Sequence, residues 1–385
     1  MNKAFFSGVL LLLSFLTQIT FAQSASSLPD WALGGFLRPA GENPIILPDT
    51  TASFMDPMSR SKIKWEINDT FNPGAAVKDG KIVVIYRSED NSGIKIGTRT
   101  SRLGYAESRD GLHFKRKKEP VLFPADDDQK AFEWPGGCED PRIAVSEDGT
   151  YVMLYTQWNR KVPRLAAATS KDLVHWTKHG PLFQDAYNGK FFNIATKSAS
   201  ILTRVKGDKQ VIAKVNGQYF MYWGERHVYA ATSTNLTDWR PLVDDKGELL
   251  ILASPRKGYF DSDMTECGPP ALLTDKGIIL LYNGRNDAAK GDKRFAAGTY
   301  SAGQMLFDKT EPTKLIARLD VPFFRPREAF EKRGQYSSGT VFIEGMAWFK
   351  HKWYLYYGCA DSRVGVAVYD PQHPAAPDPV EDTAR

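Results

Sequence analysis

The sequence predicts an all-β fold, a five-bladed β-propeller whose strands surround a central funnel. The main observation is a strand–turn–strand segment that recurs five times, at residues 75–87, 143–157, 212–225, 271–285 and 346–361. The second strand of each segment reaches a tyrosine near its end, and these tyrosines are Tyr86, Tyr155, Tyr222, Tyr282 and Tyr356. Their separations of 69, 67, 60 and 74 residues indicate a repeated supersecondary unit.

Turn chemistry and apolar runs define the strands of each repeat. The first three turns carry Asp79-Gly80, Asp148-Gly149 and Asn216-Gly217, and such pairs are strong hairpin signals. A second strand pair follows each hairpin, at residues 103–114, 164–176 and 227–239, with a looser copy at 295–307 and a truncated copy at 364–370. Since one repeat cannot bury both of its faces, we expect the five repeats to stack into a single domain.

The two ends of the chain differ from the repeats. Residues 1–22 are predicted to be a signal peptide, because Lys3 precedes an apolar run that is too short to span a bilayer and Ala22 offers a cleavage site. The protein is therefore expected to be exported, to the periplasm or the medium, with a retained anchor as the alternative. Residues 23–64 are predicted to form an N-terminal arm, which could also supply the closing strand of the last blade. The propeller is expected over residues 65–370 and a loose tail over 371–385.

Composition argues against several classes of function. The net charge of +5 comes with no basic cluster that is interleaved with aromatic residues, so a nucleic-acid partner is not expected. Three widely spaced cysteines form no disulfide framework, and the six histidines show no metal-ligand spacing, so neither a metal nor a cofactor is predicted. The aromatic content of 12% suits either a β-sheet core or sugar-binding platforms.

Polar residues recur at the same phase of successive repeats. One to five residues after the repeated tyrosines come Arg87, Gln157, Glu225, Arg285 and Asp361, and the first strands begin near Asn72, Asp140, Lys197, Glu266 and Tyr336. Polar groups that converge in a partly dry funnel destabilise the fold unless they are paired, so packing alone does not explain them. The pattern predicts a functional site in the central funnel, of either an enzyme or a binding module.

Six motifs resemble glycoside hydrolase family 130, the family of inverting β-mannoside phosphorylases and β-mannosidases built on a five-bladed propeller. They are FNPGA (71–75), YRSED (86–90), SRLGYAESRDGLHF (101–114), GGCEDPRI (136–143), CGPPALL (267–273) and YYGCAD (356–361). The resemblance covers residues 65–370, and GGCEDPR is its most specific motif. It implies a β-mannoside substrate and an active site in the funnel.

The resemblance also implies roles for individual residues. Asp140 matches the proposed general acid of the family, whose proton is thought to reach the glycosidic oxygen through the 3-hydroxyl of the mannose. The motifs that hold the mannose contain Asn72, Arg87, Arg102 and Asp361. Arg142 fits either substrate binding or orientation of the acid, and Lys197 and Tyr336 are further candidates for substrate binding.

The sequence departs from the phosphorylase pattern at two positions. Phosphorylases carry Arg, His or Lys where this chain has Glu225 and Glu266, and a carboxylate would repel phosphate by roughly several kcal/mol at an effective dielectric of about 20. A carboxylate could instead take a proton from water, as inverting hydrolysis requires. Two neighbouring glutamates should raise one pKa and leave the other group ionised, and the sequence does not distinguish which is the base.

These observations predict an inverting glycosidase that releases mannose from β-mannosides with water as the nucleophile. The β-1,2 linkage is implied by the resemblance to exported members with acidic residues at the two positions. Export agrees with hydrolysis, because sugar phosphates are poorly retained outside the cytoplasm. The alternative is a β-mannoside phosphorylase that binds phosphate through Lys197, Arg285 or His227. A non-catalytic mannan-binding propeller is the remaining alternative.

Overall fold

The computed structural model describes residues 28–375. The predicted signal peptide, residues 23–27 of the predicted arm and residues 376–385 of the predicted tail lie outside the described residues. The described chain is nearly all β, as predicted, and its two helical segments are α1 (Lys130–Glu133) and the single 3₁₀ turn η1 (Ala329–Glu331). No helix within residues 28–375 is long and apolar enough to cross a membrane.

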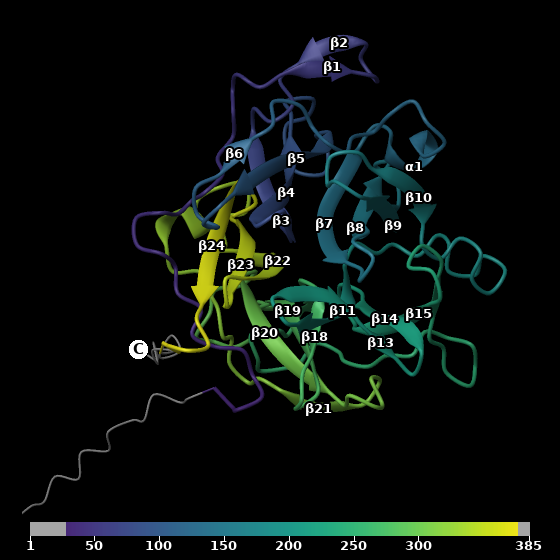
Figure 1. Cartoon of the computed structure of the whole chain (residues 1–385), viewed down its shortest axis with the longest axis vertical. Helices are drawn as coiled ribbons and strands as arrows, with labels where there is room; N and C mark the ends of the chain where they lie inside the picture. Colours follow the sequence, from purple (N-terminus) through teal and green to yellow (C-terminus); the bar gives the residue numbers. More distant parts are fainter. Residues whose placement is uncertain (1–27, 376–385) are drawn as a thin grey trace, which may run out of the picture.

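Most strands fall into five consecutive antiparallel units (Figure 1). The first contains β3 (Asp69–Lys78), β4 (Lys81–Glu89), β5 (Ser101–Ser108) and β6 (Lys115–Arg116), and the second contains β7 (Gly137–Val145), β8 (Tyr151–Trp158), β9 (Pro163–Ser170) and β10 (Thr177–Pro181). The third contains β11 (Ala199–Lys206), β12 (Lys209–Ile212), β13 (Lys214–Val215), β14 (Gln218–Trp223), β15 (Tyr229–Ser233) and β16 (Trp239–Pro241). The fourth contains β17 (Met264–Cys267), β18 (Ala271–Leu273), β19 (Ile278–Arg285), β20 (Tyr300–Phe307) and β21 (Leu315–Arg318), and the fifth contains β22 (Val341–Phe349), β23 (Lys352–Cys359) and β24 (Arg363–Tyr369).

Two short parallel contacts join neighbouring units into larger sheets. Ser101 of β5 pairs with Gly137 of β7, and Leu202 of β11 pairs with Ala271 of β18. The first two units therefore form one eight-stranded sheet and the next two form one eleven-stranded sheet, while β22–β24 stay separate. A small hairpin of β1 (Phe54–Asp56) and β2 (Ser61–Ile63) projects from this arrangement (Figure 1).

The predicted hairpins are present, with one correction in the third repeat. Asp79-Gly80 and Asn216-Gly217 all have positive φ, as the tight primed turns of β-hairpins require. The predicted hairpin over 212–225 is wrong in its first strand, which is split into β12 and β13. The long inner strand of this unit is β11, which pairs with β14 through Ala199–Ile201 and with β12 through Thr203–Lys206.

The apolar core lies between the units. Each of five apolar clusters combines side chains of two consecutive units, and the cluster around Val84 and Val364 joins the fifth unit back to the first. Successive residues of a strand point to opposite faces, so Val83 packs toward the second unit and Val84 toward the fifth. The units therefore pack in a closed sequence, each with two neighbours.

The five repeated tyrosines are fully buried, and four of the five units contain a buried carboxylate bound by a tyrosine and a cation. These sets are Glu66–Tyr86–Arg116, Glu133–Tyr155–Lys178, Asp261–Tyr282–Arg318 and Glu331–Tyr357–Arg38. In the third unit the hydroxyl of Tyr222 donates instead to the backbone carbonyl of Pro312, at 2.8 Å. No local sequence pattern predicts these sets, because each cation lies far along the chain from its acid.

Residues 28–64 contact the fifth unit through two isolated bridges. Leu37 and Ile46 form antiparallel bridges to Val368 and Val364 of β24, and the arm runs beside β24 in Figure 1. Arg38 is the cation that pairs with Glu331, at 2.6 Å. In three other units the corresponding cation comes from an outer strand, β6, β10 or β21. The beginning and end of the described chain are therefore held together.

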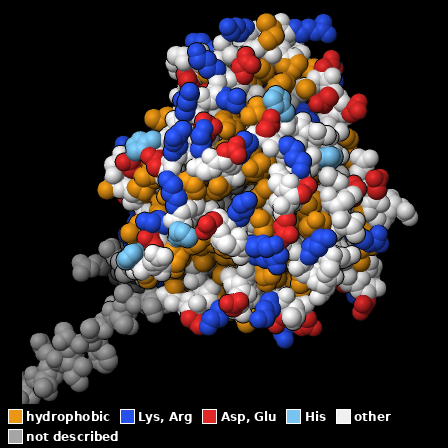
Figure 2. Space-filling model, viewed as in Figure 1, with side chains coloured by type: hydrophobic (Ala, Val, Ile, Leu, Met, Phe, Trp, Pro, Cys, Tyr) orange, Lys and Arg blue, Asp and Glu red, His pale blue; other side chains and the backbone are white. Residues whose placement is uncertain are grey.

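Charged side chains of both signs lie interspersed over the face shown in Figure 2. The three cysteines, Cys138, Cys267 and Cys359, are free and buried.

Candidate active site

Asp140 is held by a strained bulge in β7. The register of β7 shifts between Glu139 and Arg142, and Asp140 has a φ of 52°. Asn72 repeats this arrangement in β3, with a φ of 46° at a bulge before Pro73. Positive φ at a residue other than glycine costs about 1–3 kcal/mol and is concentrated at functional sites. Two strained residues in equivalent places therefore mark this end of the strands as a candidate site.

Polar and charged groups surround the carboxylate of Asp140. Its Oδ1 accepts hydrogen bonds from Asn72 Nδ2 at 2.9 Å and Arg87 Nη1 at 3.0 Å, and its Oδ2 lies 4.0 Å from Lys197 Nζ. Burial would raise the pKa of Asp140, but the charges of Arg87 and Lys197 outweigh it and hold the pKa at about 2. Asp140 is therefore ionised at neutral pH.

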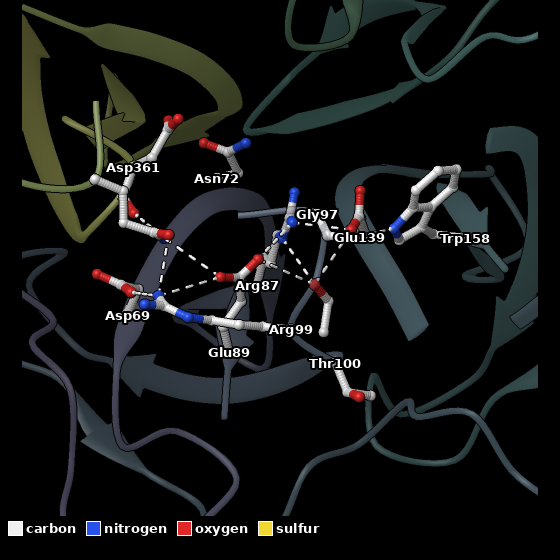
Figure 3. Close-up of polar contacts among 12 residues, drawn as sticks. Asp69, Asn72, Arg87, Glu89, Gly97, Arg99, Thr100, Glu139, Trp158 and Asp361 are labelled. Carbon is white, nitrogen blue, oxygen red and sulfur yellow. Dashed lines mark hydrogen bonds and ion pairs between the residues drawn. The ribbon is translucent and has the colours of Figure 1, made fainter. Parts of the chain in front are cut away.

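Arg87 is the main charge partner of three buried carboxylates. Besides Asp140, its guanidinium donates to Glu89 at 2.6 Å and to Glu139 at 2.8 Å, as Figure 3 shows. It also stacks over the ring of Phe71, at 4.6 Å from the centroid. Arg87 is almost fully buried, and its guanidinium holds the carboxylates of Asp140, Glu89 and Glu139 together.

Lys197 and Arg87, the two cations nearest Asp140, line a cavity of about 260 Å³. Lys197 is partly exposed, and its ammonium donates to Glu139 Oε2 at 3.1 Å. The other lining residues are Ile96, Gly97, Glu139, Trp158 and Pro163. The indole of Trp158 donates to the carbonyl of Gly97 at 3.2 Å (Figure 3), and both residues line the cavity. A cavity with an aromatic wall and charged groups suits part of a sugar ligand, and the sequence analysis did not single out these two residues.

Backbone hydrogen bonds place Glu225 and Glu266 side by side. Thr265 N donates to Glu225 O and Cys267 N donates to Gly224 O, both at 3.0 Å, so the end of β14 lies along β17. Glu266 is buried and accepts a short hydrogen bond from the hydroxyl of Ser198, whereas Glu225 is half-buried.

The two glutamates do not titrate like free carboxyl groups. Burial and the charge of Glu225 raise the pKa of Glu266 to about 8. Burial also raises the pKa of Glu225, and Asp140 adds to this while Lys197 opposes it. The sequence predicted one raised pKa, and both are raised.

Arg142 lies between Asp140 and the pair of Glu225 and Glu266. It is buried in β7 and donates to the backbone carbonyls of Asp140, Cys267 and Gly268 and to the hydroxyl of Ser198, at 3.0–3.2 Å. Of the two roles considered for Arg142, this network supports orientation of the acid.

The other candidates occupy three different places. Asp361 lies near Arg87 and Asp140, and its pKa is raised to about 7 by burial despite the charge of Arg87. Arg102 is buried and is bound by Asp56 and Asp90, each at 2.7 Å, which ties the β1–β2 hairpin to β5. The prediction that Tyr336 begins an inner strand is wrong, because β22 begins at Val341 and the hydroxyl of Tyr336 donates to the carbonyl of Gly298 in the fourth unit.

Glu344 occupies the position near the start of the inner strand of the fifth unit where Tyr336 was predicted. It lies at a bulge of β22 directly before Gly345, which pairs with Tyr356 just as Pro73 pairs with Tyr86. Glu344 is fully buried, and its Oε1 is 3.1 Å from Arg142 Nη2. The register of the repeated tyrosine is the signal that could have identified it.

An all-β fold with a buried cluster of carboxylates beside an aromatic-walled cavity is typical of carbohydrate-active enzymes. The chain belongs to glycoside hydrolase family 130, because residues 53–372 match the family profile described as "beta-1,4-mannooligosaccharide phosphorylase". A 1,2-beta-oligomannan phosphorylase of Thermoanaerobacter sp. (strain X514) is 31% identical over 318 residues, which cover 81% of this chain and 94% of that protein.

Solved structures of higher identity cover most of the chain. One, reported with the statement that the GH130 family of mannoside phosphorylases contains glycoside hydrolases that target beta-1,2 mannosidic linkages in Candida mannan, is 64% identical, with a TM-score of 0.91. It covers 92% of this chain and 98% of its own. A glycosyl hydrolase from Bacteroides ovatus is also 64% identical, with a TM-score of 0.91, and covers 92% and 99% of the two chains.

Proposed function

We propose that the protein is an inverting glycosidase that hydrolyses β-1,2-linked mannosides and releases mannose. The five units would be the blades of a five-bladed propeller, residues 65–370 would form one catalytic domain, and the site would lie in the central funnel. The observation that carries the proposal is the pair Glu225 and Glu266 beside Asp140, in a site whose cations are already partnered. The two 64%-identical structures, both described with glycoside hydrolases, support it.

The state of the candidate cations opposes phosphate binding. Lys197 is paired with Glu139 at 3.1 Å, and Arg285 is paired with Asp263 at 2.6 Å. His227 is a weak candidate, because burial lowers its pKa and leaves it neutral at pH 7. A phosphate dianion would have to compete with carboxylates for these cations and would also approach Glu225 and Glu266.

The proposed roles follow from exposure and protonation. Glu225 is the general base, since it is the more exposed glutamate and since Glu266, with a pKa of about 8, holds a proton at neutral pH. Asp140 is the general acid. Because its pKa is about 2 in the free site, this role requires the bound sugar to exclude water and raise that pKa before proton transfer. Asn72, Arg87 and Asp361 would contact or orient the mannose.

A β-mannoside phosphorylase is the second candidate. The family profile and the Thermoanaerobacter relative carry phosphorylase names, and these names favour this alternative over hydrolysis. Lys197 would then have to leave Glu139 and bind phosphate. Export of the chain remains a proposal that rests on residues 1–22.

Product analysis by proton NMR on β-1,2-mannobiose, with and without inorganic phosphate, tests the proposal. We expect α-mannose at a rate that phosphate does not change. Mannose 1-phosphate that forms only with phosphate would make the protein a phosphorylase, and sugar binding without any product would make it a binding module.

Variants assign the roles in the same assay. Asp140→Asn and Glu225→Gln should each lower kcat by at least about 100-fold while mannobiose still binds. Glu147→Gln is the matched control, because Glu147 is an exposed carboxylate paired with Lys206. Near-normal turnover of Asp140→Asn would remove Asp140 from the mechanism.

A further inference from the structure

Glu344 is a buried acid that the proposed reaction does not use. Its side chain is fully buried in β22, and neither carboxyl oxygen has a hydrogen-bond partner among the described residues. Its charged neighbours are Arg142, Asp140, Glu266 and Arg87, of which Arg142 is at ion-pair distance. Since an unsatisfied buried carboxyl is costly, a role for Glu344 has to explain why an apolar residue does not take its place.

A chain of contacts leads from Glu344 to the candidate base pair. Glu344 Oε1 lies 3.1 Å from Arg142 Nη2, and the same nitrogen donates to Ser198 Oγ at 3.0 Å. Ser198 in turn donates to Glu266 Oε1. Through its Nη1, Arg142 also donates to the backbone carbonyl of Asp140, at 3.2 Å. The guanidinium of Arg142 thus contacts the backbone of the proposed acid, Asp140, and the serine that binds Glu266. Glu344 is the carboxyl group beside this guanidinium.

We propose that Glu344 is a positioning residue that fixes the guanidinium of Arg142 and thereby the relative placement of Asp140 and the Glu225–Glu266 pair. Its place at a bulge equivalent to those of Asn72 and Asp140 supports this, because all three bulges direct a polar side chain to the same end of the inner strands. The kinetic part of the inference rests on the proposed hydrolytic function.

The role has a consequence for pH dependence. Burial, the charge of Asp140 and the mutual repulsion of the two glutamates raise the pKa values of Glu225 and Glu266. The charge of Arg142 lowers both pKa values, and Lys197 also lowers that of Glu225. If the guanidinium moves away, the pKa values of both glutamates rise. The acid-side limb of the pH profile of kcat/KM should then move to higher pH, whichever glutamate is the base.

Glu344→Met and Glu344→Gln separate positioning from packing, because both are similar in length to glutamate and only glutamine keeps an oxygen at the Oε1 position. We expect Glu344→Met to lower kcat by about 100-fold, with little change in KM, and to move the acid-side limb upward. Glu344→Gln should stay within about threefold of the wild type, with the limb unchanged. Glu133→Gln, at a buried acid of the second unit's carboxylate–tyrosine–cation set, controls for loss of stability and should leave the limb in place.

Crystal structures of the variants give a readout that does not depend on activity. The 3.0 Å contact between Arg142 and Ser198 should be lost in Glu344→Met and kept in Glu344→Gln. An unchanged contact in Glu344→Met, an unchanged limb, or a Gln variant as impaired as the Met variant would each overturn the inference. If Glu344→Met does not fold, Glu344→Asp, which withdraws the carboxyl by one methylene, must show the same changes to a smaller degree. A wild type inactive on mannosides would refute the proposed function, and the crystal structures would still decide whether Glu344 positions Arg142.

Discussion

Substitution of Arg38 by methionine should destabilise the whole protein, although Arg38 belongs to the N-terminal arm. Its side chain is 12% exposed, and it pairs with Glu331, which is fully buried and also accepts a hydrogen bond from Tyr357. Removal of one partner from a buried ion pair leaves an uncompensated charge and costs about 3–5 kcal/mol. The guanidinium carbon also lies 4.1 Å from the centroid of the Phe324 ring, so methionine removes this cation–π contact together with the ion pair.

Urea unfolding followed by tryptophan fluorescence measures this cost as a shift of the midpoint. The matched control is Lys276→Met, which breaks a pair with Asp30 that is more than half exposed and worth at most about 1 kcal/mol. A midpoint for Arg38→Met as close to the wild type as that of the control would refute the reasoning. It would mean that the arm is not needed to hold the fifth unit.

Three further predictions concern the pH dependence and the backbone. Burial raises the pKa of Glu66 in the folded state from 4.5 to about 7, so between these pH values the folded state binds a proton that the unfolded state has lost. Stability should therefore fall as the pH rises from about 4.5 to 7. In Glu66→Gln the urea midpoint should change less with pH across this window. Lys197→Met removes a charge that lowers the pKa of Asp140 and Glu225, so the acid-side limb of kcat/KM should move upward, and an unmoved limb would exclude Lys197 from the electrostatics of the site. Gly137→Ala would place its Cβ 2.0 Å from Ser101 O at a φ of 106°, so it should lower thermal stability strongly, whereas Gly149→Ala, a glycine at a φ of 81° with open space around it, should cost about 1 kcal/mol.

The sequence could predict those parts of the fold that follow local rules. Asp79-Gly80 and Asn216-Gly217 dictate tight turns on their own, and the repeated tyrosines mark strands because each is buried at the same phase. Asp140 was identifiable for a similar reason, since its Gly-Gly and Pro neighbours are adjacent in the chain. Whether five units form separate blades depends on short contacts between units, such as Ser101 with Gly137, which no local pattern specifies.

The residues that sequence reasoning missed or misplaced depend on distant partners. Tyr336 was predicted near the start of the inner strand, a position that Glu344 occupies. The error arose because the loop before β22 is long and no turn signature marks where the loop ends and the strand begins. Arg102 lies in a family motif, yet its partner Asp56 is 46 residues away, so the ion pair that buries it was not visible. The third unit was misread because Val211 and Ile212 look like an inner strand, while β11 takes that place through its pairing with β14.

The pairing of the arm with the last unit has a consequence for the order of folding. Arg38 is synthesised early and Glu331 late, and 293 residues separate them. Contacts of such long range are slow to form, because the loop between them must be closed before the contact contributes. The arm precedes the five units in the chain and is nevertheless among the last segments to reach its final partners, and until then β24 presents an open edge to which another chain could pair.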